Sequence, residues 1–296
     1  MAEEPTMTFA RSSLKALLTT VRNMGTGFLI VIVVLAGLVV LARVMRLEDA
    51  FIYFPDHEIY MTPADLGLAF EEVRFGEEGR LHGWFVPGRT DVTILWFHGN
   101  ASNLSHPGRV EFIKLMHDRL GVSFFIFDYR GYGQSSGKPS EEGLYQDARD
   151  ALAYLHSRDD VNPDRIVYYG RSLGGAVASH LATEEAPYRL ILESSFTSTP
   201  DMARVQFPFL PLGPLLYTRY SSREHLAAVH SPVLIIHGNR DRTVPPRHAD
   251  ELHAAAEEPK QLYIVRGADH NDVHYAGGEP YLEVFAEFLD LPLAPA

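Results

Sequence analysis

The sequence predicts an α/β fold in which a mostly parallel central sheet is flanked by helices. Short, continuous apolar segments alternate with segments of helical spacing over most of the chain. This order is typical of a parallel sheet that is covered on both faces. Several apolar segments end in loops that carry Ser, His, Asp or Asn. Ligands bind at the carboxyl edge of such a sheet, so these loops are the first place to look for a functional site.

The composition limits the classes of protein that remain. The 296 residues suffice for one large domain and a tail, and 46% of them are hydrophobic, so we expect a packed core. A formal net charge of -12, with no run of Lys and Arg after the first 46 residues, argues against a nucleic-acid partner. The chain has no cysteine, which excludes disulfides, thiolate metal sites and a cysteine nucleophile.

The N-terminal part of the chain has the composition of a membrane anchor. Residues 1–22 form a polar tail, and residues 23–46 form the predicted transmembrane anchor, which has no charged residue from Asn23 to Ala42. At ~1.5 Å per residue this uncharged stretch is ~30 Å long as a helix, enough to cross the hydrocarbon of a bilayer. A buried core helix and a cleaved signal peptide are the alternatives. Val40-Leu41-Ala42 would pass as a signal-peptide cleavage site, but Arg43 directly follows it, which favours an uncleaved signal anchor.

Basic residues on the two sides of the span predict its orientation. Arg11, Lys15 and Arg22 precede the span, whereas Arg43 and Arg46 follow it. Cytoplasmic flanks carry the excess of positive charge in single-pass proteins. We therefore expect the N-terminus inside and the following domain on the non-cytoplasmic side of the membrane.

The α/β domain is predicted over residues 50–296 and opens with an antiparallel hairpin. Residues 72–75 and 81–86 alternate in polarity, and the glycines between them provide a turn. Buried strands and helices then follow one another. Strands are predicted at 92–97, 122–127, 166–169, 190–192, 232–237 and 262–265, and helices at 110–120, 140–156, 175–182, 247–256 and 281–289.

The pentapeptide Gly170-Arg171-Ser172-Leu173-Gly174 lies between a predicted strand and a predicted helix. Strand, sharp turn and helix are the context that a G-x-S-x-G nucleophile elbow needs. The serine then lies at the tip of the turn in a strained backbone conformation, so its neighbours must be small. The alternative is a chance pattern in an ordinary loop. The flanking strand and helix favour the elbow, with Ser172 as nucleophile.

A serine hydroxyl needs a base, and that base is usually a histidine oriented by a buried carboxylate. In an elbow enzyme the acid and the histidine follow the serine in that order. Asp241 follows the strand at 232–237, and His270 follows the strand at 262–265. Both residues are therefore expected at the carboxyl edge of the sheet, beside Ser172. We predict a Ser172–Asp241–His270 triad.

Other residues compete for the roles of base and acid. Glu193 ends the strand before Asp241, a place where some elbow enzymes carry the acid. His98 and His237 end strands and precede glycines, which is more typical of structural positions. The rival bases are His98, His237 and His274, and the rival acids are Glu193 and Asp269.

A tetrahedral intermediate requires two backbone N–H donors that are already in place. The N–H of Leu173, directly after the nucleophile, is the first predicted donor. The second is expected from the loop after Phe97, where Gly99 allows the backbone to come close. The N–H of Asn100 is preferred there, with Ala101 as the alternative.

Seven motifs together give the chain a resemblance to the α/β-hydrolase superfamily over residues 50 to 290. The chain most resembles its branch of N-terminally membrane-anchored serine hydrolases, which act on acyl esters or thioesters. The resemblance implies the Ser172–Asp241–His270 triad, no metal and no organic cofactor. The motifs are Tyr53-Phe54-Pro55, Leu81-His82-Gly83-Trp84, His98-Gly99-Asn100-Ala101, Asp128-Tyr129-Arg130-Gly131-Tyr132-Gly133, Gly170-Arg171-Ser172-Leu173-Gly174, His237-Gly238-Asn239-Arg240-Asp241 and Gly267-Ala268-Asp269-His270.

Residues 196–221 occupy the place of the large cap that many such enzymes carry. Prolines interrupt the apolar stretch from Phe207 to Tyr217, so a single regular helix is excluded. One interpretation is a small apolar lid over an acyl pocket. The alternative is a packed helical connector inside the core.

These observations predict a membrane-anchored serine hydrolase that cleaves carboxylic esters or thioesters through an acyl-enzyme. The expected partners are a small-molecule or lipid-like acyl substrate and the bilayer. A peptidase or an acyltransferase would use the same groups, and a catalytically silent binding module is the alternative from another class. Dehalogenase and epoxide hydrolase chemistry is disfavoured, because it needs a carboxylate where Ser172 stands.

Overall fold

The computed structural model describes residues 28, 31, 33–35, 37, 38, 48–210 and 212–295, and divides into the units Met1–Glu48 and Asp49–Ala296. In the first unit the described residues between 28 and 38 are helical and exposed. The predicted tail at 1–22 and most of the predicted anchor at 23–46 lie outside the described residues. Within the part that is described, none of the helices has both the length and the apolar composition for a membrane crossing.

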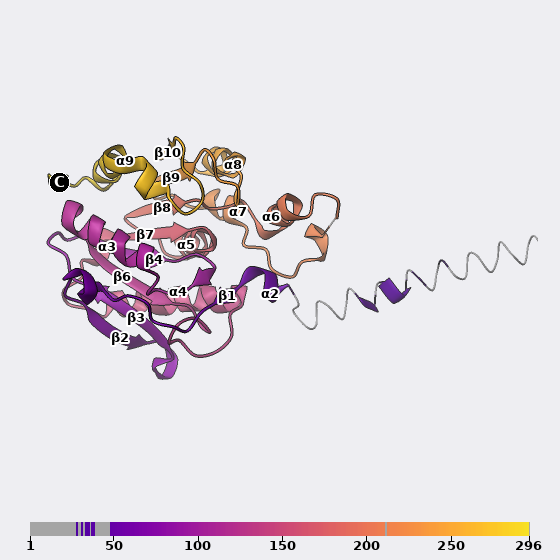
Figure 1. Ribbon diagram of the computed structural model, residues 1–296, viewed down its shortest axis with the longest axis horizontal. Coiled ribbons are helices and arrows are strands. Elements are labelled where there is room, and N and C mark those ends of the chain that lie inside the picture. Colours follow the sequence, from indigo (N-terminus) through magenta and orange to yellow (C-terminus); the bar gives the residue numbers. More distant parts are fainter. Residues whose placement is uncertain are drawn as a thin grey trace, which may run out of the picture. The chain divides into compact units, whose positions relative to one another are not determined.

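The second unit is built on an eight-stranded sheet in the order β10-β9-β8-β7-β4-β6-β3-β2 (Figure 1). Neighbours from β10 to β6 pair in parallel, and β3 and β2 pair antiparallel at the other edge. The predicted, mostly parallel sheet is thus confirmed. Its strands are β2 (Glu71–Phe75), β3 (Leu81–Val86), β4 (Thr93–Phe97), β6 (Ser123–Asp128), β7 (Ile166–Arg171), β8 (Arg189–Glu193), β9 (Val233–Gly238) and β10 (Lys260–Val265).

The predicted N-terminal hairpin is also confirmed, since Glu71 pairs with Phe85 and Phe75 with Leu81. A separate parallel pair joins the segment that opens this unit to the loop after β4. Its strands are β1 (Phe54–Pro55) and β5 (Ala101–Ser102). This pair ties the predicted oxyanion loop to the start of the domain.

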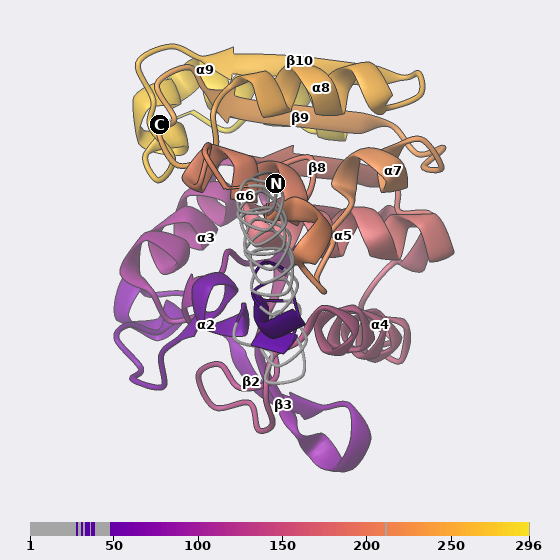
Figure 2. The same cartoon turned by 90° about the vertical axis from the view of Figure 1, so that its right-hand side faces the viewer.

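Helices flank the sheet as predicted (Figures 1 and 2). The final helix is longer than predicted, because it begins at Val273 and continues across a non-helical residue at Gly278. Gly277, Gly278 and Pro280 concealed its first part in the sequence. The helices are α2 (Asp49–Ile52), α3 (Pro107–Leu120), α4 (Glu141–His156), α5 (Leu173–Glu184), α6 (Thr199–Gln206), α7 (Ser222–Leu226), α8 (Arg247–Ala255) and α9 (Val273–Leu289).

Two apolar layers hold these helices against the sheet. Leu95 and Phe97 of β4 belong to one layer, which also contains residues of α4, α5 and α8. Ile94 and Trp96 of the same strand belong to the other, with residues of α3 and α9. Successive side chains of a strand point to opposite faces, so a strand buried on both faces must be apolar throughout. This is why β4 shows no alternation in the sequence.

Residues 196–221 contain no single long helix, as the prolines predicted. The segment forms α6, then a 3-10 turn at Gly213–Leu215. Between them Phe209 is 95% exposed and Leu210 is 54% exposed. Whether the segment covers an acyl pocket, as the lid interpretation expects, stays a prediction.

Candidate active site

Ser172 stands at the junction between β7 and α5, with φ 53° and ψ -119°. Positive φ is costly for a residue with a side chain and persists only where the surroundings enforce it. Two backbone hydrogen bonds do so here. The Ser172 N–H donates to the Glu193 carbonyl at 2.9 Å, and the Ser172 carbonyl accepts from the Gly175 N–H at 3.0 Å.

The glycines of the pentapeptide are required by close packing. A Cβ on Gly170 would lie 2.4 Å from the Gly174 carbonyl oxygen, and one on Gly174 would lie 1.9 Å from the Phe97 carbonyl oxygen. Side chains do not tolerate such distances, so α5 can approach the ends of β7 and β4 only with glycine at both positions. Ser172 therefore lies in the sharp turn between strand and helix that the sequence predicted, and its role as nucleophile stays a prediction.

The structure brings Ser172, His270 and Asp241 into contact. The Nε2 atom of His270 lies 3.2 Å from the Ser172 Oγ, and its Nδ1 lies 2.7 Å from the Asp241 Oδ2. Each residue follows its own strand: β7, β10 and β9. An ionised carboxylate can only accept, so Nδ1–H donates to Asp241 and Nε2 is left to accept the Ser172 proton. This is the arrangement of a nucleophile, a base and an acid that orients the base.

Asp241 is held as a carboxylate. Its Oδ1 accepts from the backbone N–H groups of Thr243 at 2.9 Å and Val244 at 2.7 Å. Burial opposes ionisation, but hydrogen bonds from His237 and His270 outweigh it and hold the pKa of this carboxyl well below its ordinary value. A carboxylate in this state stabilises an imidazolium on His270.

The rival histidines contact other groups. The Nε2 atom of His237 lies 2.9 Å from the Val244 carbonyl and 3.2 Å from Asp241, so His237 supports the acid. His98 is fully buried, and burial lowers its pKa well below the ordinary value. His274 packs against the ring of Phe112.

The rival acids also have other partners. Glu193 accepts a hydrogen bond from the Tyr281 hydroxyl at 2.6 Å and lies 3.4 Å from Arg171. Asp269 accepts from the Arg242 side chain at 2.7 Å and from the backbone N–H of His270 at 2.8 Å. Its carboxylate therefore touches the backbone of the base and not the imidazole ring.

Arg171 is a site residue that the sequence analysis did not identify. Its Nη2 donates to the His270 carbonyl at 2.9 Å, and the Ser194 hydroxyl donates to the same carbonyl at 3.4 Å. Glu193 holds the Arg171 guanidinium from the other side. In the sequence, only the position of Arg171 inside the pentapeptide pointed to the site. Its contact with His270 could not be predicted, because the two residues are 99 positions apart.

The loop after β4 lies beside the nucleophile, where the second oxyanion donor was predicted. A Cβ on Gly99 would lie 3.6 Å from the Ser172 Cβ. The next residue, Asn100, is held by its carbonyl, which accepts from the Phe54 N–H at 2.9 Å and the Tyr132 hydroxyl at 2.8 Å. The Asn100 backbone is thus fixed next to the elbow.

The other predicted donor, Leu173, is the first residue of α5. The first N–H groups of a helix have no intrahelical acceptor, and the helix dipole makes this end favourable for negative charge. Both predicted donors therefore remain candidates. In the described part of the chain, no group of three or more His, Asp or Glu side chains is placed to hold a metal ion.

The elbow, the strand order and the Ser172–His270–Asp241 contacts define a protein of the α/β-hydrolase class. The chain belongs to this family: the family described as "Alpha/beta hydrolase domain" matches residues 90–275.

Named relatives are found in bacteria, plants and fungi. The uncharacterized protein Rv2307c of Mycobacterium tuberculosis is 40% identical over 265 residues, which cover 88% of this chain and 93% of the relative. The alpha/beta hydrolase domain-containing protein WAV2 of Arabidopsis thaliana is 35% identical over 287 residues, covering 87% and 91%. Protein bem46 of Schizosaccharomyces pombe is 32% identical over 272 residues, covering 85% and 89%.

Solved structures share the fold at lower identity. The Pyrococcus furiosus esterase Pf2001 superposes with a TM-score of 0.67 at 21% identity, covering 81% of this chain and 97% of the esterase. An alpha-beta hydrolase from Vibrio vulnificus gives a TM-score of 0.63 at 22% identity, covering 75% of this chain and 82% of the hydrolase. The expected fold family is thus confirmed by sequence and by structure.

Proposed function

We propose that this protein is a serine hydrolase that cleaves carboxylic ester or thioester bonds through an acyl-enzyme. The observation that carries the proposal is the contact chain from Ser172 through His270 to Asp241, on an elbow whose serine has positive φ. Three side chains from three separate loops meet here in the order that nucleophilic catalysis requires.

In the proposed mechanism the Ser172 Oγ attacks the substrate carbonyl carbon while His270 Nε2 takes the hydroxyl proton. The carbonyl oxygen becomes an oxyanion, which the N–H groups of Leu173 and Asn100 stabilise. His270 then gives its proton to the leaving alcohol or thiol as the tetrahedral intermediate collapses to the acyl-enzyme. Water, deprotonated by His270, attacks the acyl-enzyme, and collapse of the second intermediate releases the acid and returns the proton to Ser172.

We further propose acyl chains or lipid-like molecules as substrates and the bilayer as the place of action. Support comes from the exposed apolar side chains of Phe207, Phe209 and Leu210 after α6 and from the uncharged stretch Asn23 to Ala42. Exposed apolar groups of this kind suit contact with amphiphiles. In the proposed arrangement the span is an uncleaved signal anchor and the catalytic domain lies on the non-cytoplasmic side.

A fluorophosphonate probe tests the nucleophile directly. The full-length chain in detergent should be labelled, and Ser172→Ala should not be. Absence of labelling in the wild type, or equal labelling of both proteins, would contradict the proposal. A chain-length panel of aryl esters and acyl thioesters then tests the substrate class: long-chain preference supports it, and activity confined to acetyl and butyryl esters opposes it.

The anchor has its own test. Full-length protein expressed in cells should stay in the membrane pellet after carbonate extraction, and a variant that begins at residue 47 should not. Release of the full-length chain by carbonate would contradict anchoring. Protection of the domain from added protease in inverted vesicles would support the proposed orientation, and digestion there would oppose it.

A further inference from the structure

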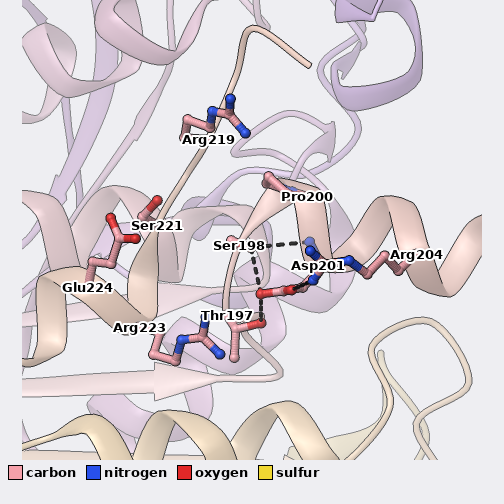
Figure 3. A pocket seen from close by; sticks show the side chains of 9 residues that line it. All are labelled: Thr197, Ser198, Pro200, Asp201, Arg204, Arg219, Ser221, Arg223 and Glu224. Carbon is pink, nitrogen blue, oxygen red and sulfur yellow. Dashed lines mark hydrogen bonds and ion pairs between the residues drawn. The ribbon is translucent and has the colours of Figure 1, made fainter. Parts of the chain in front are cut away.

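A cavity of about 360 Å³ lies outside the triad, between the loop after β8, the start of α6 and residues 219–224 (Figure 3). Its wall is polar and charged. Arg204, Arg219 and Arg223 line it, together with Asp201 and Glu224. The cavity therefore holds one more cationic than anionic side chain, in a chain whose formal net charge is -12.

The carboxylate of Asp201 is engaged within the wall. Its Oδ2 accepts from the hydroxyl of Thr197 at 2.8 Å and from that of Ser198 at 2.6 Å, while its Oδ1 accepts from Arg204 (Figure 3). Burial opposes its ionisation, but these hydroxyl hydrogen bonds and the charges of Arg204 and Arg223 lower its pKa. Asp201 thus holds the Thr197 and Ser198 hydroxyls and the Arg204 guanidinium in place. The charge of Arg204 largely compensates the charge of the Asp201 carboxylate.

Among the described contacts, Arg219 and Arg223 each use one guanidinium nitrogen. The Nη1 of Arg219 donates to the Gly213 carbonyl at 3.2 Å, and the Nη1 of Arg223 lies 3.3 Å from Glu251. A guanidinium carries five N–H donors in a planar fork that matches the oxygens of carboxylate and phosphate. One nitrogen of each group fixes its direction, and the remaining donors suit a bidentate acceptor.

The cavity is connected to the active site through the loop after β8. The Ser195 hydroxyl donates to the Ser172 carbonyl at 3.0 Å. Two residues further on, Thr197 lines the cavity, and its hydroxyl lies 2.9 Å from His248 Nδ1. A ligand that orders this loop therefore acts on a segment that touches the nucleophile's own backbone.

We propose that this cavity binds a phosphate-like oxyanion through Arg219 and Arg223, with Arg204 and Ser221 beside it. The oxyanion is either a phosphate group carried by the ester substrate or free phosphate. Only the first source rests on the function proposed above.

The site is tested by isothermal titration calorimetry. Inorganic phosphate is titrated at constant ionic strength into the full-length chain in detergent. The wild type should bind saturably. The double variant Arg219→Gln/Arg223→Gln should bind at least about tenfold more weakly, because it removes two cationic groups whose charge-assisted hydrogen bonds hold the oxyanion. Glu224→Gln should bind more tightly than the wild type, because it removes a negative charge from the cavity wall.

The opposite signs of these two effects separate binding from misfolding, since a damaged protein would not gain affinity. Lys138→Gln, at an exposed position outside the cavity, removes one positive charge and is the control for the effect of overall charge; its affinity should equal that of the wild type. Absence of saturable binding, or equal binding by the wild type and the double variant, would overturn the proposal.

Kinetics on the wild type distinguish the two sources. If the substrate's own phosphate occupies the cavity, inorganic phosphate should raise KM for a phosphate-bearing acyl ester and leave KM for a neutral ester of the same acyl group unchanged. If the cavity takes free phosphate, inorganic phosphate should raise KM for neither ester. Ser172→Ala should still bind phosphate, so failure of ester hydrolysis and failure of phosphate binding are separate results.

Discussion

The guanidinium of Arg171 donates a hydrogen bond of 2.9 Å to the backbone carbonyl of His270. The residue directly before Ser172 thus holds the main chain of His270. Glu193 lies 3.4 Å from the same guanidinium and accepts from Tyr281 at 2.6 Å. The loops that carry Ser172 and His270 are therefore joined by these side chains as well as by the Ser172–His270 contact, and we expect Arg171 to position His270.

Arg171→Gln should lower kcat about 10- to 100-fold, since small displacements of a reacting group have effects of that size. KM should change little, because the substrate contacts remain. Arg171→Lys should recover part of kcat by keeping the charge beside Glu193. Steady-state kinetics on the three proteins, together with thermal unfolding, provide the measurement. A loss of kcat that follows the loss of melting temperature would indicate a purely structural role.

Ser172→Gly should stabilise the fold while it abolishes catalysis. Ser172 has φ 53°, which costs on the order of 1 kcal/mol or more for a residue with a side chain and nothing comparable for glycine. Denaturant unfolding should show an increase of about 1 kcal/mol relative to Ser172→Ala, which keeps the strain. Equal stability of the two variants would show that the elbow carries no such strain.

Gly174→Ala should destabilise the domain by several kcal/mol or prevent its folding, because its Cβ would lie 1.9 Å from the Phe97 carbonyl oxygen. Overpacking of a tight contact typically costs about 1–3 kcal/mol, and backbone cannot move aside as a side chain can. Gly99→Ala is the matched control: its Cβ would meet Ser172 at 3.6 Å, an ordinary contact. Urea unfolding should separate the two variants clearly.

Stability should fall as the pH drops from about 6.5 to about 4. Burial lowers the pKa of His225 to about 4 and that of His248 to about 4. Below pH 6.5 the unfolded chain binds protons that the folded chain does not, so acid favours unfolding. His225→Gln should reduce the pH dependence of the unfolding free energy by up to about 3 kcal/mol across this window. An unchanged slope in unfolding titrations would contradict burial of a neutral imidazole.

The features that could be predicted from the sequence are local. Apolar runs marked the strands, and the loops after β7, β9 and β10 held Ser172, Asp241 and His270 because parallel strands bring their carboxyl ends to one edge. The features that were missed depend on long-range contacts. Arg171 meets His270 across 99 residues, and the three cavity arginines come together from two separate segments. Spacing alone contains no signal for either.

The strand order also places the candidate site away from the β2–β3 edge of the sheet. The three loops of the site follow β7, β9 and β10, whereas the hairpin β2–β3 forms the opposite border. Its turn, Glu77–Gly79, is solvent-accessible and has no buried residue. Exposed turns of this kind tolerate insertions best. This turn is therefore a suitable position for grafting a fluorescent or affinity module, which would report on the protein without disturbing the residues of the candidate site.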